Sequence, residues 1–163
     1  MKLLIYGPMF AKKSTHLIKS YKDSPNSIAI TNKIDMRYGA GKIISHDGIE
    51  IDAINCCEFS EIAEAINGVE TIFVDEIQFF SQEFVEKLLA LDKKIFFYGL
   101  DKNFLGESFP TTEFLQKRIE SVKFWAKCRC GMPADFTKKN GGSNNIIEIG
   151  GSELYEPVCK KHR

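Results

Sequence analysis

The first residues whose types and spacing could do chemistry follow a short apolar run near the N-terminus. After Leu3–Tyr6 the sequence continues as Gly7-Pro8-Met9-Phe10-Ala11-Lys12-Lys13-Ser14-Thr15 and then enters a helical pattern. Between a strand and a helix, such a loop offers phosphate oxygens consecutive backbone N–H groups and a lysine, and it offers Mg²⁺ a hydroxyl. We therefore interpret residues 7–15 as a phosphate-binding loop. The alternative is an ordinary strand-turn-helix with a basic helix start.

One position departs from that pattern, because Lys12 stands where the second glycine of such a loop belongs. If the backbone is left-handed there, a residue other than glycine costs roughly 1–2 kcal/mol. A strain of this size weakens phosphate binding by about tenfold per 1.4 kcal/mol without abolishing it. The sequence is thus compatible with an active enzyme and with a weakened nucleotide-binding relative.

Two adjacent acids, Asp75 and Glu76, follow the apolar run Thr71–Val74. The carboxyl ends of parallel strands share one edge of a sheet, so this pair and the phosphate loop should converge. Adjacent residues on a strand point in opposite directions, so one acid could hold hydrated Mg²⁺ while the other accepts the proton of a substrate hydroxyl. Alternatively, the acids only cap a helix that begins near Ser81.

A third group of chemical residues lies near the C-terminus. Cys128 and Cys130 form one close pair, and Cys159 and His162 form another. Three thiolates and one imidazole suit a tetrahedral Zn²⁺ ion with no open position, which is typical of a structural site. The pattern therefore predicts structural zinc.

The remaining thiols and imidazoles show no ligand pattern. We expect Cys56 and Cys57 to be buried or partly exposed thiols, and we assign no role to His16 or His46.

The elements that must position these groups are indicated by apolar runs that alternate with helical patterns. Strands are predicted at Leu3–Tyr6, Ser27–Thr31, Glu70–Val74 and Lys94–Tyr98, and helices at 13–21 and 80–91. Near-continuous apolar strands separated by helices predict an α/β fold with a mostly parallel sheet covered on both faces.

The segments that follow the last of these strands read differently. Residues 101–112 are expected to form an ordered loop. Beyond Trp125 we expect strands at Ala134–Thr137 and Ile146–Ile149, in a tail too small for its own core. A tail of this size needs a cross-link or a bound metal to be stable, and the four metal ligands would supply one.

Length and composition exclude several classes of protein. The chain has 163 residues, and its 22 basic and 22 acidic residues cancel, which argues against nucleic-acid binding. No apolar run approaches the roughly 20 residues of a membrane span, and the N-terminal run is too short for a secretion signal. An odd number of cysteines, 5, favours reduced thiols and metal ligands over disulfides. We therefore expect a cytoplasmic protein without a membrane partner.

Taken together, the motifs resemble the thymidine kinase family of the single-domain, zinc-containing type. The likeness covers nearly the whole chain, in order. Besides the phosphate loop and the zinc ligands, it rests on five segments. They are Ile34-Asp35-Met36-Arg37-Tyr38, Ser45-His46-Asp47-Gly48, Val74-Asp75-Glu76-Ile77-Gln78-Phe79-Phe80, Tyr98-Gly99-Leu100-Asp101-Lys102-Asn103-Phe104-Leu105-Gly106-Glu107-Ser108-Phe109 and Ile149-Gly150-Gly151-Ser152-Glu153-Leu154-Tyr155.

The resemblance implies a P-loop NTPase-like (RecA-like) fold with a small C-terminal zinc-ribbon-like lobe. It implies an α/β nucleotide-binding domain at residues 1–126 and a zinc-binding lobe with a substrate lasso loop at 127–163. The implied reaction transfers the γ-phosphoryl of ATP to the 5′-hydroxyl of thymidine. A homotetramer inhibited by dTTP is also implied.

The resemblance also assigns roles to residues. Glu76 is the implied general base. The residues implied to bind ATP and Mg²⁺ are Gly7, Pro8, Met9, Phe10, Ala11, Lys12, Lys13, Ser14, Thr15, Asp35, Arg37, Asp75 and Gln78. Those implied to bind the nucleoside are Met9, Phe79, Leu100, Phe104, Phe109, Thr137, Ile149, Gly150, Gly151 and Tyr155.

Overall fold

The computed structural model describes residues 1–34 and 41–163, and its centre is a six-stranded sheet. The strand order is β5-β2-β6-β7-β1-β8, and each neighbouring pair is parallel. This confirms the predicted mostly parallel α/β fold. The strands are β1 (Lys2–Tyr6), β2 (Ser27–Asn32), β5 (Ile54–Cys56), β6 (Thr71–Val74), β7 (Lys94–Gly99) and β8 (Glu120–Lys123).

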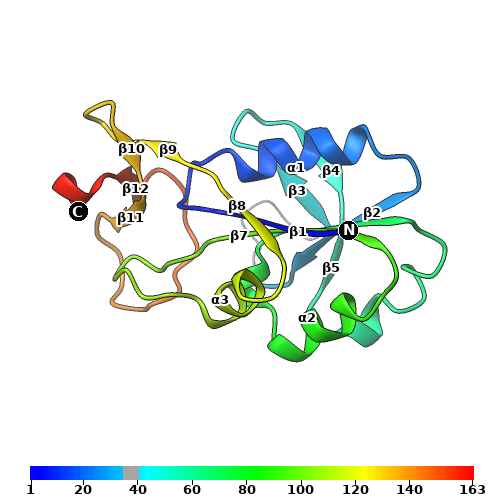
Figure 1. The fold of residues 1–163 in the computed structure, drawn as a ribbon. Coiled ribbons are helices and arrows are strands. Elements are labelled where there is room, and N and C mark those ends of the chain that lie inside the picture. Colours follow the sequence, from blue (N-terminus) through cyan, green and yellow to red (C-terminus); the bar gives the residue numbers. More distant parts are fainter. Residues whose placement is uncertain (35–40) are drawn as a thin grey trace.

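Both faces of the sheet are covered, as Figure 1 shows, which explains why its strands read as continuous apolar runs. Helix α1 (Lys13–Lys22) packs on one face, together with the hairpin of β3 (Lys42–Ile44) and β4 (Glu50–Asp52). Helices α2 (Gln82–Leu89) and α3 (Pro110–Gln116) lie on the other. In the described part of the chain, no helix is long and apolar enough to cross a membrane.

Alternation along the strands divides the core between the two faces. In β6, Phe73 packs with the α1 cluster, whereas Ile72 and Val74 belong to the cluster beneath α2 and α3. Strand β1 divides in the same way, with Ile5 on the α1 side and Leu4 on the other. Because alternate residues point to opposite faces, each strand contributes to both halves of the core.

The residues after Trp125 form a small lobe beyond the carboxyl ends of the strands, at the left of Figure 1. Strand β9 (Ala126–Lys127) pairs with β10 (Pro133–Ala134), and β11 (Phe136–Lys139) pairs with β12 (Tyr155–Val158), both antiparallel. The buried cluster here is small: Ala126, Cys128, Ala134, Val158 and Cys159, together with Ala11 of the phosphate loop. The chain then ends in a 3₁₀ turn, η3 (Lys160–His162).

Three of the predictions made for this half of the chain are wrong. Ala134–Thr137 is not one strand, because Ala134 ends β10 and Phe136 begins β11. Ile146–Ile149 is not a strand, because β12 is the partner of β11 and residues 140–154 form the loop that joins them. We call residues 140–154 the lasso loop. The segment 101–112 is not entirely a loop, because Pro110 begins α3 and the apolar pair Phe114 and Leu115 packs inward. A proline at the first helical position fits that start.

Candidate active site and metal site

A cavity of about 250 Å³ lies at the carboxyl edge of the sheet, between the phosphate loop and the lasso loop. It brings together most of the residues singled out in the sequence. Those that line it are Met9, Phe10, Ala11, Lys12, Lys13, Ser14, Thr15, Asp75, Glu76, Gln78, Phe79, Leu100, Phe104, Phe109, Thr137, Ile149, Gly150, Gly151 and Tyr155. Gly7 and Pro8 are absent from the lining, and Asp35 and Arg37 fall outside the described residues.

The phosphate loop ends at a helix N-terminus that is open to an anion. Lys12 is the N-cap of α1, and in the described part of the chain no side chain makes a capping hydrogen bond there. The Lys13 Nζ donates to the carbonyl oxygens of Gly7 at 3.0 Å and Pro8 at 2.7 Å. The N–H groups of a helix's first turn and the helix dipole together favour a phosphate group at such a position.

Gly7 is required where the chain leaves β1. Its φ is +152°, and a Cβ would lie 2.2 Å from the carbonyl oxygen of Phe124. The first glycine of the loop therefore lets the backbone pass beside β8.

Most of the described residues with a strained backbone conformation line the cavity. Within the described residues, the positions other than glycine with positive φ are Phe10, Lys12, Asn26 and Glu76, and all but Asn26 line the cavity. Lys12 is left-handed, with φ 60° and ψ 27°, which is the conformation in which its replacement of glycine is costly. Strain of this kind persists where the surroundings enforce it, and it clusters at functional sites.

The two acids reach the cavity together rather than on opposite sides. Asp75 Oδ2 accepts a hydrogen bond from Ser14 Oγ at 3.3 Å, which joins the end of β6 to the phosphate loop. Asp75 Oδ1 accepts from the Glu76 N–H at 3.0 Å. The expected opposite directions do not apply, because β6 ends at Val74 and Glu76 turns into the left-handed region, with φ 52° and ψ 45°.

The alternative prediction, that these acids cap the next helix, is wrong. Ser81 is the N-cap of α2 and accepts from the Phe84 N–H at 3.1 Å. Asp75 and Glu76 therefore remain at the cavity rather than at the helix.

Gln78 fixes the orientation of the Glu76 carboxylate. Its Nε2 donates to Glu76 Oε2, and its Oε1 accepts from the Leu100 N–H at 3.0 Å. Gln78 lies on the 3₁₀ turn η2 (Ile77–Phe79) and is buried. This close packing needs a glycine at the end of β7, because a Cβ on Gly99 would lie 2.6 Å from Gln78 Oε1.

The small lobe closes the opposite side of the cavity. Thr137 Oγ1, on β11, accepts from the Met9 N–H at 3.1 Å and so ties the lobe to the phosphate loop. Tyr155, at the start of β12, donates from its hydroxyl to the carbonyl oxygen of Glu148 at 2.6 Å. Phe104 and Phe109 supply an aromatic wall from the loop that follows β7. Apolar walls with a few fixed polar groups are typical of a small-molecule site.

Several residues that line the cavity are not predicted by the sequence pattern. His46 was given no role, yet it lies at the cavity with its ring edge-on to Phe10, the centroids 5.7 Å apart. The signal was the turn-prone Ser45-His46-Asp47-Gly48, which the β3–β4 hairpin carries to the site. The others missed are Ile44, Asp47, Lys102, Asn103, Ile146, Ile147 and Glu148.

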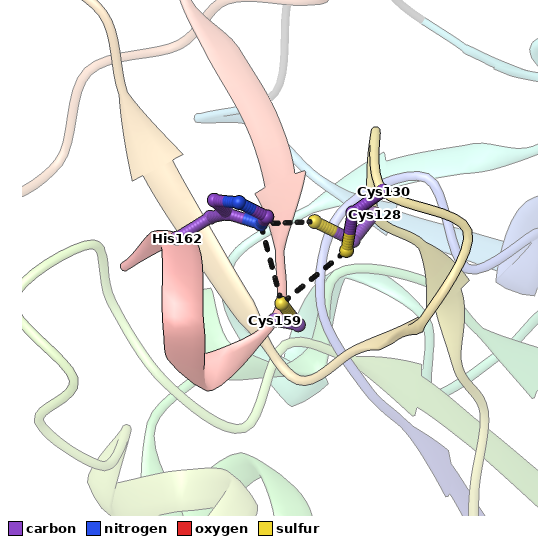
Figure 2. A group of neighbouring side chains, drawn as sticks. All are labelled: Cys128, Cys130, Cys159 and His162. Carbon is purple, nitrogen blue, oxygen red and sulfur yellow. Dashed lines mark hydrogen bonds between the residues drawn. The ribbon is translucent and has the colours of Figure 1, made fainter.

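The four predicted metal ligands meet at one point of the small lobe, as Figure 2 shows. The Sγ atoms of Cys128 and Cys159 each lie 3.4 Å from His162 Nδ1, and Cys130 Sγ lies 3.7 Å from Cys159 Sγ. Around a tetrahedral Zn²⁺ ion with Zn–S bonds of about 2.3 Å, two sulfurs stand about 3.8 Å apart. The N–H groups of Cys130 and Cys159 lower the pKa of Cys128 to about 6, which favours the thiolate. The donor set therefore fits zinc.

Comparison with known proteins agrees with this arrangement. The family model described as thymidine kinase matches residues 2–163. The chain belongs to the thymidine kinase family. A thymidine kinase of Shewanella oneidensis is 35% identical over 178 aligned residues, which cover 96% of this chain and 93% of the relative. Membership makes the chain a kinase that phosphorylates thymidine, and it favours catalysis over the weakened binding relative.

Proposed function

We propose that the chain transfers the γ-phosphoryl of ATP to the 5′-hydroxyl of thymidine and releases dTMP and ADP. The observation that carries the proposal is one cavity that joins a phosphate loop, two carboxylates and an apolar wall in a member of the thymidine kinase family. Phosphoryl transfer needs mainly positioning and neutralisation of charge, and these residues supply both.

We assign the phosphate groups to the loop Gly7–Thr15 and the base role to Glu76. Lys13 would exchange the carbonyl oxygens of Gly7 and Pro8 for phosphate oxygens. The Glu76 carboxylate would accept the proton of the 5′-hydroxyl, with Gln78 holding one of its oxygens. Asp75 and Ser14, already in contact, would hold Mg²⁺, which neutralises phosphate charge when bound. We place Asp35 and Arg37 beside the metal and the phosphates on the resemblance alone.

The nucleoside would lie between the aromatic wall and the lasso loop. Met9, Phe79, Leu100, Phe104 and Phe109 would exclude water from one side of the base. From the other side Thr137, Ile149, Gly150, Gly151 and Tyr155 would bring backbone groups to its edge.

The small lobe would then be stabilised by zinc and would help to bind the nucleoside. We propose that Cys128, Cys130, Cys159 and His162 bind one structural Zn²⁺ ion. We propose residues 1–126 as the unit that binds ATP and 127–163 as the unit that binds zinc and completes the thymidine pocket. A homotetramer, inhibition by dTTP and a cytoplasmic location are further proposals from the resemblance, and sedimentation velocity and dTTP titration test the first two.

A steady-state assay across the common deoxynucleosides, with ATP and Mg²⁺, tests the function. We expect phosphorylation of thymidine with the largest kcat/KM, and dTMP and ADP formed in equal amounts. A protein that folds but phosphorylates none of these nucleosides would contradict the proposal.

A further inference from the structure

A partly buried lysine, Lys139, lies where the two ends of the lasso loop meet. Lys139 is the last residue of β11 and stands opposite Tyr155, the first residue of β12. Because strand residues alternate in direction, Thr137 and Lys139 share the face of β11 that borders the cavity. The Lys139 side chain is only 5% exposed. Lysines are rarely buried to this extent unless the ammonium is paired.

The Lys139 ammonium gathers acceptors from the whole lasso loop. Its Nζ lies 2.5 Å from Glu148 Oε2, 2.5 Å from the carbonyl oxygen of Ser143 and 3.3 Å from that of Asn145. These acceptors match the three donors of an ammonium group. The same Nζ lies 5.0 Å from the ring centroid of Phe104, on the opposite wall of the cavity. One cation therefore links the loop to the aromatic wall.

Glu148 completes the arrangement from the loop side. Its Oε2 also accepts hydrogen bonds from the N–H of Ser143 at 2.9 Å and from the Ser143 hydroxyl at 2.8 Å. The hydrogen bond from Lys139 holds the pKa of Glu148 below its ordinary value, so the carboxylate stays ionised at neutral pH. The carbonyl oxygen of Glu148 accepts from the Tyr155 hydroxyl. Both ends of this residue are thus fixed immediately before Ile149 and Gly150.

We propose that Lys139 and Glu148 form a latch that holds the lasso loop in its thymidine-binding shape before thymidine arrives. Both are then positioning residues for the nucleoside and have no part in binding ATP. A loop ordered in advance loses less conformational freedom when the ligand binds, so the latch raises affinity without touching the base. This inference rests on the proposed function.

Five variants test the latch: Lys139→Met, Glu148→Gln, the double variant, Lys139→Arg and, as a matched control, Lys138→Met on the opposite face of the same strand. Losing a charge-assisted hydrogen bond should raise the KM and the calorimetric Kd for thymidine roughly tenfold in Lys139→Met and Glu148→Gln. We expect kcat and the KM for ATP to change little. Because the two residues act as a unit, the double variant should be no worse than either single variant. Lys139→Arg should recover most of the affinity.

Hydrogen exchange supplies a readout that does not depend on turnover. Without nucleoside, the amide of Ser143 should exchange faster in Lys139→Met than in the parent, whereas amides of β6 should not change. Equal effects of Lys139→Met and Lys138→Met on thymidine KM and on exchange would overturn the latch. So would a loss of kcat and ATP affinity as large as the loss of thymidine affinity. If the parent phosphorylates no nucleoside, the proposed function fails, and the exchange measurement still decides the latch.

Discussion

Glu76 takes a backbone conformation that glutamate rarely adopts, at the point where β6 ends. The left-handed turn carries its carboxylate into the cavity beside Asp75, and Gln78 holds it there. If Glu76 accepts the hydroxyl proton, Glu76→Gln should lower kcat by roughly 100-fold or more, the usual contribution of a positioned base. Steady-state kinetics with thymidine and ATP measure the effect. Glu64→Gln, at an exposed position, is the control, and an unchanged rate in a folded Glu76→Gln protein would remove Glu76 from this role.

Lys12 combines a backbone strain with a charge at the cavity, and two substitutions separate them. Lys12→Gly removes both, and Lys12→Met keeps the strain but removes the charge. For an active kinase, we expect the kcat/KM for ATP in Lys12→Gly to stay within roughly tenfold of the parent, the range set by a left-handed strain of 1–2 kcal/mol. Lys12→Met should be the weaker of the two variants. Recovery of a nearly absent rate in Lys12→Gly would instead identify the parent as the weakened relative.

The carboxyl end of β7 packs closely against the turn η2. The missing side chain of Gly99 leaves room for the Gln78 amide and for Ile77, whose Cγ2 would lie 2.7 Å from a Cβ. Gly99→Ala should therefore move Gln78 away from Glu76 and lower kcat by roughly tenfold to 100-fold, because small misplacements at a reacting centre are costly. Overpacking should also destabilise the fold by about 1–3 kcal/mol.

Steady-state kinetics and thermal unfolding measure these two effects. Gly68→Ala is the matched control, since a Cβ there meets open space. Equal kinetics in the two variants would contradict a positioning role for this contact.

Most of the parallel sheet was predictable because its signals are local, but the edge strands β5 and β8 were not predicted. Four strands and two helices follow from apolar runs and helical spacing, and the phosphate loop follows from its place between the first strand and helix. The hairpin β3–β4 was not predictable from such signals, because its three-residue strands are too short to show a period. Ile146 and Ile147 led to the wrong prediction of a strand, because these apolar residues line the cavity instead.

The site residues also differ in whether a local sequence pattern could predict them. The acids after β6 and the four proposed metal ligands are visible in the sequence, because their chemistry depends on residue type and spacing. The contact of Gln78 with Leu100 depends on how two strand ends pack, and no local pattern encodes it. The roles of Glu148 and Lys139 were missed for the same reason, since they join residues across the lasso loop.

For the whole molecule, the proposed zinc site controls whether the small lobe can complete the cavity. Its apolar cluster consists largely of alanine and cysteine side chains, which bury little surface. Removing zinc should therefore loosen the region after Trp125 and abolish thymidine binding, while the sheet keeps its protection. Elemental analysis, which should find close to one zinc per chain, and hydrogen exchange before and after chelation measure this.

Cys130→Ser should behave like the chelated protein, because it removes one of the four ligands. Cys57→Ser, outside the cluster, should keep its zinc and its activity. Zinc-free protein with full thymidine affinity would contradict a stapling role.

The position of β1 has a consequence for how the protein is made. This strand begins at Lys2, yet its neighbours in the sheet are β7, from residue 94, and β8, which ends at Lys123. The phosphate loop also packs against the segment that follows β8, because Gly7 lies next to Phe124. During synthesis, β1 must therefore wait until β7 or β8 has been made before it can pair. The phosphate loop, although encoded by residues 7–15, therefore reaches its final packing only after Phe124 has been made.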